Sequence, residues 1–348
     1  MAEITGSAAG PPRIGEIWDR LGPVIGLVLI LVVFGAREPE KFLSARNIGN
    51  VAGQTVVVGT SAVGMTFVII SGGIDLSVGS MIALTGVVGT LAMKSDFASG
   101  SIVIGVAMAM AAGFLCGLFN GVVITMTRLP PFIVTLGTLQ IYRGAALLIT
   151  RGLPVTNLPP AFEKLANALQ TFDLGFGPII LPYSFYFLIG LGFIAWLILR
   201  YTVFGVAVYA IGSSERTARL CGIRVNLVKC AVYVICGLGA GMAGILQMSR
   251  LITGQPTAAE GLELEVIAAV VIGGGSLLGG EGTIRGSIVG ALLMRFLFNG
   301  CNIVGISPFV QKIIIGTIII LAVWAAQIRH SPWIFGRLRR RAASGERG

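Results

Sequence analysis

Histidine and paired cysteines are nearly missing from this chain of 348 residues. The one histidine is His330, in a polar stretch near the carboxyl terminus. The five cysteines form no C-x-x-C pair: Cys116, Cys221, Cys230, Cys236 and Cys301. Metal and redox centres need clusters of these residue types, and hydrolytic triads need a histidine beside a serine or cysteine. The sequence therefore predicts no metal, no redox centre and no catalytic nucleophile, so the chain is not expected to be an enzyme.

A nucleotide-binding loop is missing as well. No lysine follows a glycine anywhere in the sequence, so the phosphate-binding motif G-x-x-x-x-G-K-[ST] is absent. If ATP drives this protein, another chain must bind the ATP and its magnesium. No cofactor is expected on this chain.

Charged residues are also scarce, at 11% of the chain against roughly 25% in ordinary globular domains. Hydrophobic residues make up 55% and gather in ten apolar blocks. Most blocks approach the roughly 20 residues that a helix needs to cross a bilayer. The sequence predicts an all-α, polytopic integral membrane helix bundle. Its ten expected helices within 21–327 cover residues 21–36, 49–70, 78–93, 101–126, 132–149, 179–199, 228–248, 264–278, 286–304 and 309–327.

The net charge of +10 comes from loops and from a basic tail, residues 328–348, and not from a surface suited to nucleic acid. The tail carries Arg337, Arg339, Arg340 and Arg341. Basic residues beside membrane helices stay in the cytoplasm, where they meet anionic lipid. With an even number of crossings, the segment 1–20, the tail and the long loop 200–229 lie inside, and the long loop 150–178 lies outside.

Glycine is abundant, with 50 residues, and several recur every four positions. The spaced sets are Gly113, Gly117 and Gly121; Gly237 and Gly241; and Gly282, Gly286 and Gly290. Small residues at this spacing let helix backbones approach closely in a bilayer. We expect them at tight helix contacts, with hinges as the alternative.

Residues 67–86 and 267–286 show a weak internal echo. Each reads as an apolar run, a cluster of glycines with a leucine, and the start of a new helix. Such echoes are typical of transporters built from two related halves around a central site. Chance similarity of glycine-rich turns is the alternative.

The inner loop contains IGSSERTARLCGI at residues 211–223. Ser213 or Ser214 can cap a helix, Glu215 suits its positive start, and Gly222 can end it. The expected cytoplasmic helix carries Ser213, Ser214, Glu215, Arg216, Thr217, Ala218, Arg219 and Gly222. It is either a simple surface helix or the element that a mechanical partner grips.

Asp75, beside Ser77 in an SGGIDLS turn, is the only acidic residue between Glu40 and Asp96. The predicted topology places it at the cytoplasmic ends of two crossings. Capping the helix expected from Leu76 is the simpler role for its carboxylate. A gate or an ATPase contact is the alternative.

Polar side chains within the predicted crossings are candidates for a translocation path. They are Asn120, Thr135, Gln140, Tyr142, Arg143, Arg295, Asn299 and Asn302. Because charge at bilayer depth is costly, Arg143 and Arg295 should face the interior, a partner or water. Asparagine and glutamine can instead join helices by hydrogen bonds. No Asp, Glu or His lies well inside any predicted crossing.

Four motifs, in order, resemble the permease subunits of bacterial ribose-type sugar ABC importers. They are VIISGGIDLSVGSMIALTG at 68–86, RLPPFIVTLGT at 128–138, YAIGSSERTARLCGI at 209–223 and GLELEVIAAVVIGGGSLLGGEGTIRGSIVGALL at 261–293. The resemblance covers nearly all of residues 49–327. It implies a homodimeric pore in the bacterial inner membrane, a cytoplasmic ATP-binding subunit and a periplasmic sugar-binding protein.

The resemblance also implies that the ATP-binding subunit holds the helix at 213–222, a degenerate form of the E-A-A-x-x-x-G region of importer permeases. Arg216 and Thr217 stand where Glu and the first Ala are usual. Glu215, one residue earlier, is the alternative acidic residue.

An ion-coupled secondary transporter of small solutes is the main alternative, and a membrane enzyme is another. The first would need a carboxylate or histidine deep in the bundle, and the second a nucleophile with its base. The resemblance therefore implies a permease subunit for a monosaccharide or small polyol.

Overall fold

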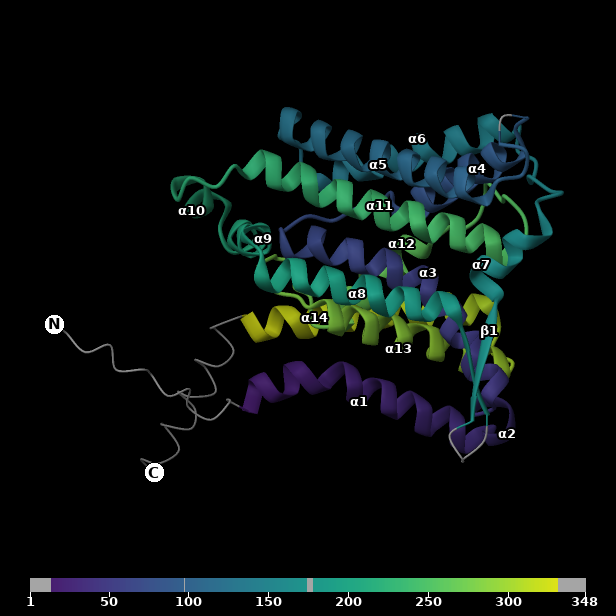
Figure 1. Ribbon diagram of the computed structural model, residues 1–348. Helices are drawn as coiled ribbons and strands as arrows, with labels where there is room; N and C mark the ends of the chain where they lie inside the picture. The colour runs from purple at the N-terminus through teal and green to yellow at the C-terminus, as the bar shows by residue number, and fades with distance from the viewer. Residues whose placement is uncertain (1–13, 97, 174–177, 331–348) are drawn as a thin grey trace, which may run out of the picture.

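The computed structural model describes residues 14–96, 98–173 and 178–330, in which helices lie side by side along one direction (Figure 1). Among the described residues, six helices are long and apolar enough to cross a membrane: α3 (Ala45–Ile70), α5 (Ile102–Thr127), α6 (Pro131–Thr150), α8 (Tyr183–Tyr201), α11 (Val225–Leu251) and α13 (Ile284–Ile303). Shorter apolar stretches occur in α1 (Ile14–Arg37), α4 (Val78–Lys94), α9 (Val203–Ser213) and α14 (Pro308–His330). The chain is thus a polytopic helical membrane protein.

Each predicted segment overlaps a helix, and the segment 264–278 corresponds to α12 (Leu262–Ile272). Side-chain caps fix several of the helix starts. Ser44 accepts a hydrogen bond from the N–H of Asn47 at 3.2 Å, and Thr202 accepts one from Gly205 at 3.1 Å. These bonds satisfy backbone donors that the first turn of a helix leaves free.

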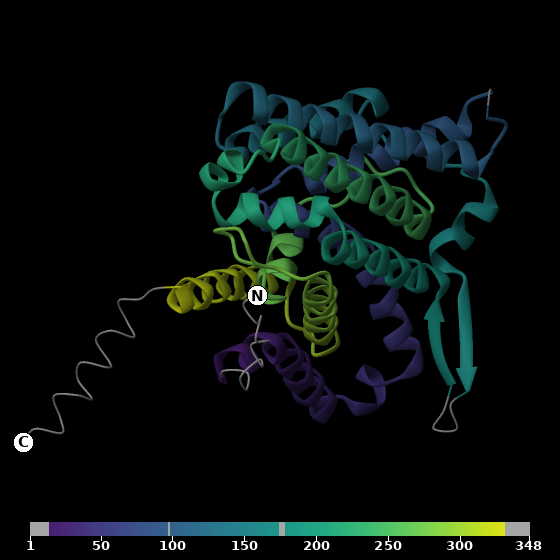
Figure 2. The same cartoon turned by 60° about the vertical axis from the view of Figure 1, so that its left-hand side comes forward.

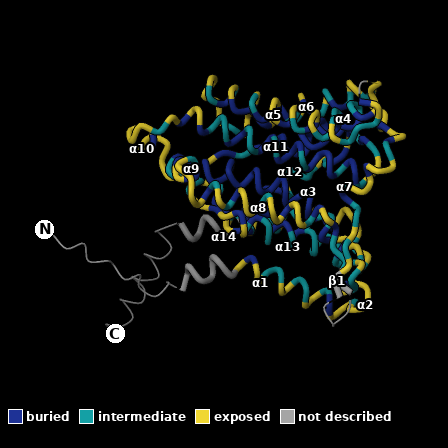
Figure 3. The backbone as a smooth tube through the Cα atoms, in the orientation of Figure 1, coloured by how far each residue is buried: buried dark blue, intermediate teal, exposed yellow. Residues whose placement is uncertain are grey.

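The core of the bundle is formed by α3 and α11, with dark buried backbone along both in Figure 3. The glycines spaced along α5 and α11 face one another there. A Cβ on Gly121 would lie 2.8 Å from the Cα of Cys230, and one on Gly241 would lie 2.9 Å from the carbonyl oxygen of Ala109. Gly286 and Gly290 contact Gly273 and Ala269 in the same way. The prediction of tight helix contacts is confirmed at these positions.

The expectation of a purely α-helical chain is wrong in one segment. Strand β1 (Leu169–Asp173) pairs antiparallel with β2 (Pro178–Pro182), so that Leu169 lies opposite Pro182. The prediction began a crossing at residue 179, but α8 begins only after Pro182. Proline disfavours helical backbone in the residue before it, which explains the later start.

The hairpin lies at one end of the bundle, together with α2 (Pro39–Phe42), the 3₁₀ helix η1 (Pro160–Glu163) and α7 (Lys164–Asn167). The short helix α10 (Glu215–Leu220) lies at the opposite end, as Figures 1 and 2 show from two directions. The two long predicted loops, 150–178 and 200–229, therefore lie at opposite ends. The basic tail and residues 1–13 lie outside the described residues.

Two of the chain's passes through the bundle are only partly helical. α4 is preceded by the non-helical residues 71–77, and α12 by the irregular residues 252–261. The starts of these two helices meet inside the bundle, because Gly79 lies against the carbonyl of Ala259 and the carboxylate of Glu263. The predicted helix 264–278 ends at Ile272 because the following glycines adopt positive φ, +92° at Gly274 and +88° at Gly279.

Candidate functional site

Helix α10 protrudes from its end of the bundle (Figure 1). The hydroxyl of Ser214 caps it by accepting a hydrogen bond from the N–H of Thr217 at 3.3 Å. Gly222, at φ +82°, follows its last turn, where its N–H donates to the carbonyl of Arg219. Both predicted ends of the helix are confirmed, with Ser214 as the cap. Ser213 instead ends α9, an apolar helix that the sequence analysis assigned to the loop.

The side chains of α10 divide into one buried and several exposed positions. Ala218 is buried, whereas Arg216, Thr217 and Leu220 are exposed. Leu220 is 82% exposed, although it is the most apolar residue of the helix. An exposed leucine flanked by arginines on a protruding helix is typical of a contact surface.

The carboxylate of Glu215 is bound within the chain. It accepts hydrogen bonds from Lys229 Nζ at 2.7 Å and from Arg219 at 2.8 Å. The bond from Lys229, more than that from Arg219, lowers the pKa of Glu215 below its usual 4.5, against partial burial that raises the pKa. Glu215 is therefore ionised at neutral pH and fastens α10 to the first turns of α11.

A pocket lies beside α10. The turn from Arg128 to Pro131, which joins α5 to α6, forms one wall. Glu215, Arg219 and Lys229 contribute to the other wall. The RLPP motif and the α10 motif, far apart in sequence, thus form one polar surface at this end of the bundle.

Asp75 lies inside the bundle and is fully buried. Its Oδ1 accepts hydrogen bonds from the N–H and the hydroxyl of Ser77, at 2.9 and 2.6 Å, and its Oδ2 accepts one from Asn120 at 3.3 Å. Tyr142 of α6 donates to Asn120 Oδ1 at 2.9 Å. This Asp75 network joins the non-helical segment before α4 to α5 and α6.

Asp75 lies between the end of α3 and the start of α4, as predicted, but deeper in the bundle than the sequence suggested. Asn120, its partner, lies seven residues, about 10 Å, from the end of α5. The displacement arises because residues 71–77 run back into the bundle before α4 begins at Val78, not at Leu76. The carboxylate bonds to Ser77, the residue before the helix, and not to N–H groups within α4.

Of the predicted path residues, Asn120, Tyr142 and Thr135 lie around this buried segment. Thr135 donates to the carbonyl of Ile74 at 3.3 Å. Asn299 and Asn302 instead join helices: Asn299 exchanges two 2.8 Å hydrogen bonds with Asn47 of α3, and Asn302 accepts one from Gln311 of α14 at 2.7 Å. Gln140 is exposed on α6.

Carboxylates do lie inside the bundle, contrary to the sequence-based expectation. Besides Asp75, Glu265 on α12 forms an ion pair with Arg295 on α13, whose guanidinium also lies over the ring of Phe298. Arg295 therefore faces a partner in the interior, as predicted. Glu265 was missed because the expected helix began at Leu264, which put the acidic residues of GLELEV at its end.

Arg143 also faces the interior. Its guanidinium donates hydrogen bonds of 2.8 Å to the carbonyls of Pro256 and Ala258. Both acceptors belong to the irregular residues 252–261, which the sequence analysis treated as a connection outside the membrane. No group of three or more His, Cys, Asp or Glu suited to a metal occurs in the part of the chain that the structure describes.

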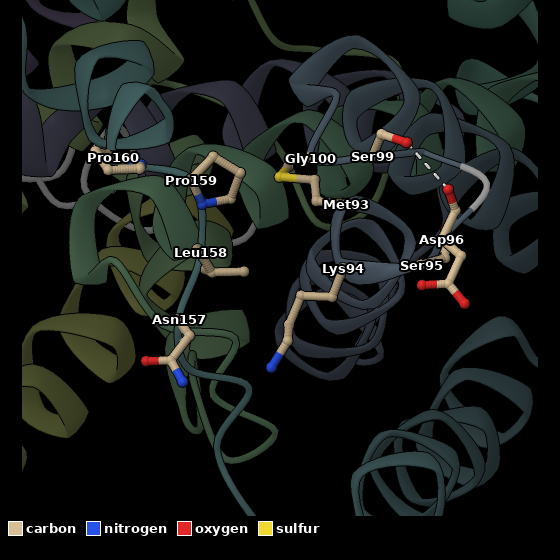
Figure 4. A pocket seen from close by; sticks show the side chains of 10 residues that line it. All are labelled: Met93, Lys94, Ser95, Asp96, Ser99, Gly100, Asn157, Leu158, Pro159 and Pro160. Carbon is tan, nitrogen blue, oxygen red and sulfur yellow. Dashed lines mark hydrogen bonds between the residues drawn. The ribbon is translucent and has the colours of Figure 1, made fainter.

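A second pocket lies at the end of the bundle opposite α10. Figure 4 shows that residues 93–96, 99 and 100, at the α4–α5 turn, face residues 157–160 of the long outer loop across it. Lys94 and Asp96 contribute opposite charges, and the hydroxyl of Ser99 bonds to the carbonyl of Asp96 at 3.1 Å. This pocket offers a polar surface with charge of both signs.

Comparisons with known proteins agree in one family. Residues 47–323 match the model described as "Branched-chain amino acid transport system / permease component". The chain is 40% identical to the ribose import permease of Escherichia coli K12, over 86% of this chain and 91% of that protein. It is 36% identical to an L-arabinose ABC transporter permease of Azospirillum brasilense, over 93% and 94%, and 33% identical to a xylose transport permease of Escherichia coli K12, over 86% and 90%. No solved structure matches the chain.

Proposed function

The chain belongs to this family of permease components, and from that premise we propose that it is the membrane-spanning subunit of an ATP-driven importer for a monosaccharide or a similar small polyol. The family description mentions branched-chain amino acids, but relatives that align over most of this chain are permeases for ribose, arabinose and xylose. These similarities support a sugar as the transported solute. The protein resides in the bacterial inner membrane.

The observation that carries the proposal is the protruding helix α10 with its exposed Leu220. Because Glu215 fastens α10 to α11, movement of a bound partner can be transmitted through α10 to the bundle. The partner is a separate cytoplasmic subunit that binds and hydrolyses ATP with magnesium, because this sequence has no phosphate-binding loop of its own. The permease itself makes or breaks no covalent bond.

We further propose ten crossings in two related halves, made by α1, α3, α4, α5, α6, α8, α11, α12, α13 and α14. The two echoing glycine turns support this division because they pack together: the N–H of Gly280 bonds to the carbonyl of Ile70 at 2.8 Å. In this topology, α10 and the basic tail face the cytoplasm and anionic lipid. The pocket of Figure 4 faces the periplasm, where its mixed charges suit a sugar-binding protein. A second copy of the chain completes the pore.

An ion-coupled transporter is less well supported. Its coupling carboxylate would have to take up and release an ion. In the described structure, Asp75 accepts three hydrogen bonds and Glu265 is paired with Arg295. Neither Asp75 nor Glu265 leaves an open site, whereas Glu260 is exposed, so the case against ion coupling rests on the similarity to sugar and ABC transporter permeases.

Reconstitution tests the proposal. Liposomes that contain the permease, its ATP-binding subunit and internal ATP should take up a labelled monosaccharide when the binding protein is added outside. Omitting the ATP-binding subunit, the ATP or the binding protein should each abolish uptake. Accumulation by the permease alone under a proton or sodium gradient would contradict the proposal and favour the secondary transporter.

A further inference from the structure

The irregular residues 252–261, here called the re-entrant segment, run from one end of the bundle into its interior. Near the outer end, Gly254 pairs with Val155 of the long outer loop through two hydrogen bonds of 2.9 Å. At the inner end, Ala259 lies against Gly79, at the start of α4. The segment then continues into α12, whose 11 residues span only about 16 Å. A helix of that length crosses about half of the hydrocarbon layer, and the re-entrant segment completes the pass.

Contacts with full-length helices place the segment at membrane depth. Arg143, which donates to the carbonyls of Pro256 and Ala258, lies twelve residues after the start of α6 and seven before its end. Glu265, one turn into α12, pairs with Arg295, which lies eleven residues after the start of α13 and eight before its end. Both arginines are thus in the interior of crossing helices. The chain between these contacts lies in the same layer.

The segment is polar and open on the surface of the protomer. Thr257 and Glu260 are exposed, and Glu263 is half-buried. Glu260 and Glu263 are close enough to act on the charge of Arg143. One turn before Arg143 on α6, Gln140 is exposed as well. Gly137 and Gly144 flank it with open space over each.

Lipid cannot cover such a surface. An ionised carboxylate at the bilayer centre costs several kcal/mol, and non-helical backbone occurs at membrane depth only where protein buries it or water reaches it. Neighbouring protein in the protomer leaves Thr257 and Glu260 uncovered. In the assembled importer this face must therefore be covered by another chain or reached by water.

We propose that the re-entrant segment lines the translocation path and hydrogen-bonds the hydroxyl groups of a neutral polyhydroxylated solute through Glu260, Thr257 and Gln140. This inference rests on the proposed function and adds the solute contacts to it. Carboxylate oxygens accept from hydroxyl groups, and threonine and glutamine both donate and accept. Two glutamates against one arginine leave the face net negative, which disfavours anions and leaves neutral sugars unaffected. Arg143 acts as a positioning residue, because its guanidinium is committed to two carbonyls of the segment.

Water access is tested by cysteine labelling of the complete importer in membranes, in a Cys221→Ser background that removes an exposed native thiol. Thr257→Cys and Glu260→Cys should each react with a charged, membrane-impermeant methanethiosulfonate, and saturating ribose, arabinose or xylose, whichever is transported, should slow the reaction several-fold. Phe193→Cys, in the middle of α8 and exposed on the protomer, is the lipid-facing control and should react only at background. Background reaction at both test positions would overturn the proposal. So would reaction that appears only after the importer is dissociated, because that pattern indicates a protein interface.

Uptake in the same vesicles provides the second measurement. Glu260→Ala and Thr257→Val should each reduce sugar uptake by about tenfold or more, the loss expected for a hydrogen bond to a charged or buried group, while the permease still stimulates its ATPase. Glu40→Ala, an exposed carboxylate on α2, should transport normally. Normal uptake by both test variants would overturn the assignment of Thr257 and Glu260 to the path. The proposed function of the chain would still stand in that case, provided that the unsubstituted importer takes up the sugar.

Discussion

Glycine sets the distance between α5 and α11. Gly113, Gly117 and Gly121 on α5 meet the backbone of Gly237, Tyr233 and Cys230 on α11, so that the two main chains touch without side chains between them. In a bilayer, where lipid tails are as apolar as leucine, such contacts replace the hydrophobic drive that packs helices in water. Asn120, which donates to Asp75, lies on α5 between Gly117 and Gly121, so the same stretch of helix also positions this hydrogen bond.

Gly117→Ala tests this contact. The added Cβ would overlap the carbonyl of Tyr233, and a backbone atom in a helix cannot move aside as a side-chain tip can. Overpacking of this kind destabilises by about 1–3 kcal/mol, so the melting temperature of the purified protein in detergent should fall by several degrees. Gly190→Ala on α8, where nothing lies within 4 Å of the new Cβ, is the matched control. Equal melting temperatures for the two variants would contradict the role of Gly117.

The side chains of helix α10 divide into those that hold the helix to the bundle and those that are exposed. Glu215, paired with Arg219 and Lys229, ties it to the bundle, and Arg216 and Leu220 remain free to meet a partner. Because the pKa of Glu215 is lowered, its ion pairs contribute their full stability at any pH above the ordinary pKa of glutamate. That stability is lost only as the pH falls through the lowered pKa. The ion pairs of Glu215 are therefore intact at neutral pH.

The double variant Arg216→Ala with Leu220→Ser should uncouple transport. It removes the exposed cation and apolar group of α10 but leaves Glu215 and its partners in place, so membrane insertion and melting temperature should not change. ATPase stimulation by the permease should fall at least about tenfold, as expected when central contacts of an interface are truncated. Leu153→Ser, another exposed leucine at the opposite end of the bundle, should behave as wild type. Full stimulation by the double variant would remove α10 from the coupling surface.

At the scale of the whole molecule, one protomer leaves a polar face exposed at membrane depth, where lipid would otherwise contact it. The re-entrant segment and the exposed side of α6 form this face. A second copy, related by a two-fold axis, would enclose a path between two such faces. ATP-driven motion at α10 would then alternate the ends at which that path is open, as a bias between two states of similar energy.

The native mass tests this assembly. Purified permease in a mild detergent should have a protein mass twice the 36.3 kDa of one chain when light scattering is corrected for bound detergent. Two copies that enclose this polar face shield it from lipid or detergent tails, which favours the dimer in a mild detergent. A stable mass of a single chain that still supports ATP-driven uptake after reconstitution would contradict a pore shared between two copies.

The sequence by itself determined the membrane location, the helical segments and α10, because these follow from local properties. Apolar runs of sufficient length and the cap and glycine around 214–222 act within a few residues of their own positions. The four-residue glycine pattern likewise predicted close helix contacts that the structure contains. It did not predict the hairpin or α9, whose short apolar stretches have no distinctive period.

Only the tertiary structure decided which polar residues share a site. Asp75 belongs with Asn120 and Tyr142 because residues 71–77 turn back into the bundle, and Arg143 belongs with the re-entrant segment because α6 passes beside it. Asn299 and Asn302, chosen for the same polar character, join helices instead. Hydrogen bonds reach across dozens to hundreds of residues here, and hydropathy, which averages over neighbours in the chain, contains no information about such pairings. A pass that is half helix and half irregular chain has the same composition as a loop beside a short helix, and packing alone distinguishes the two.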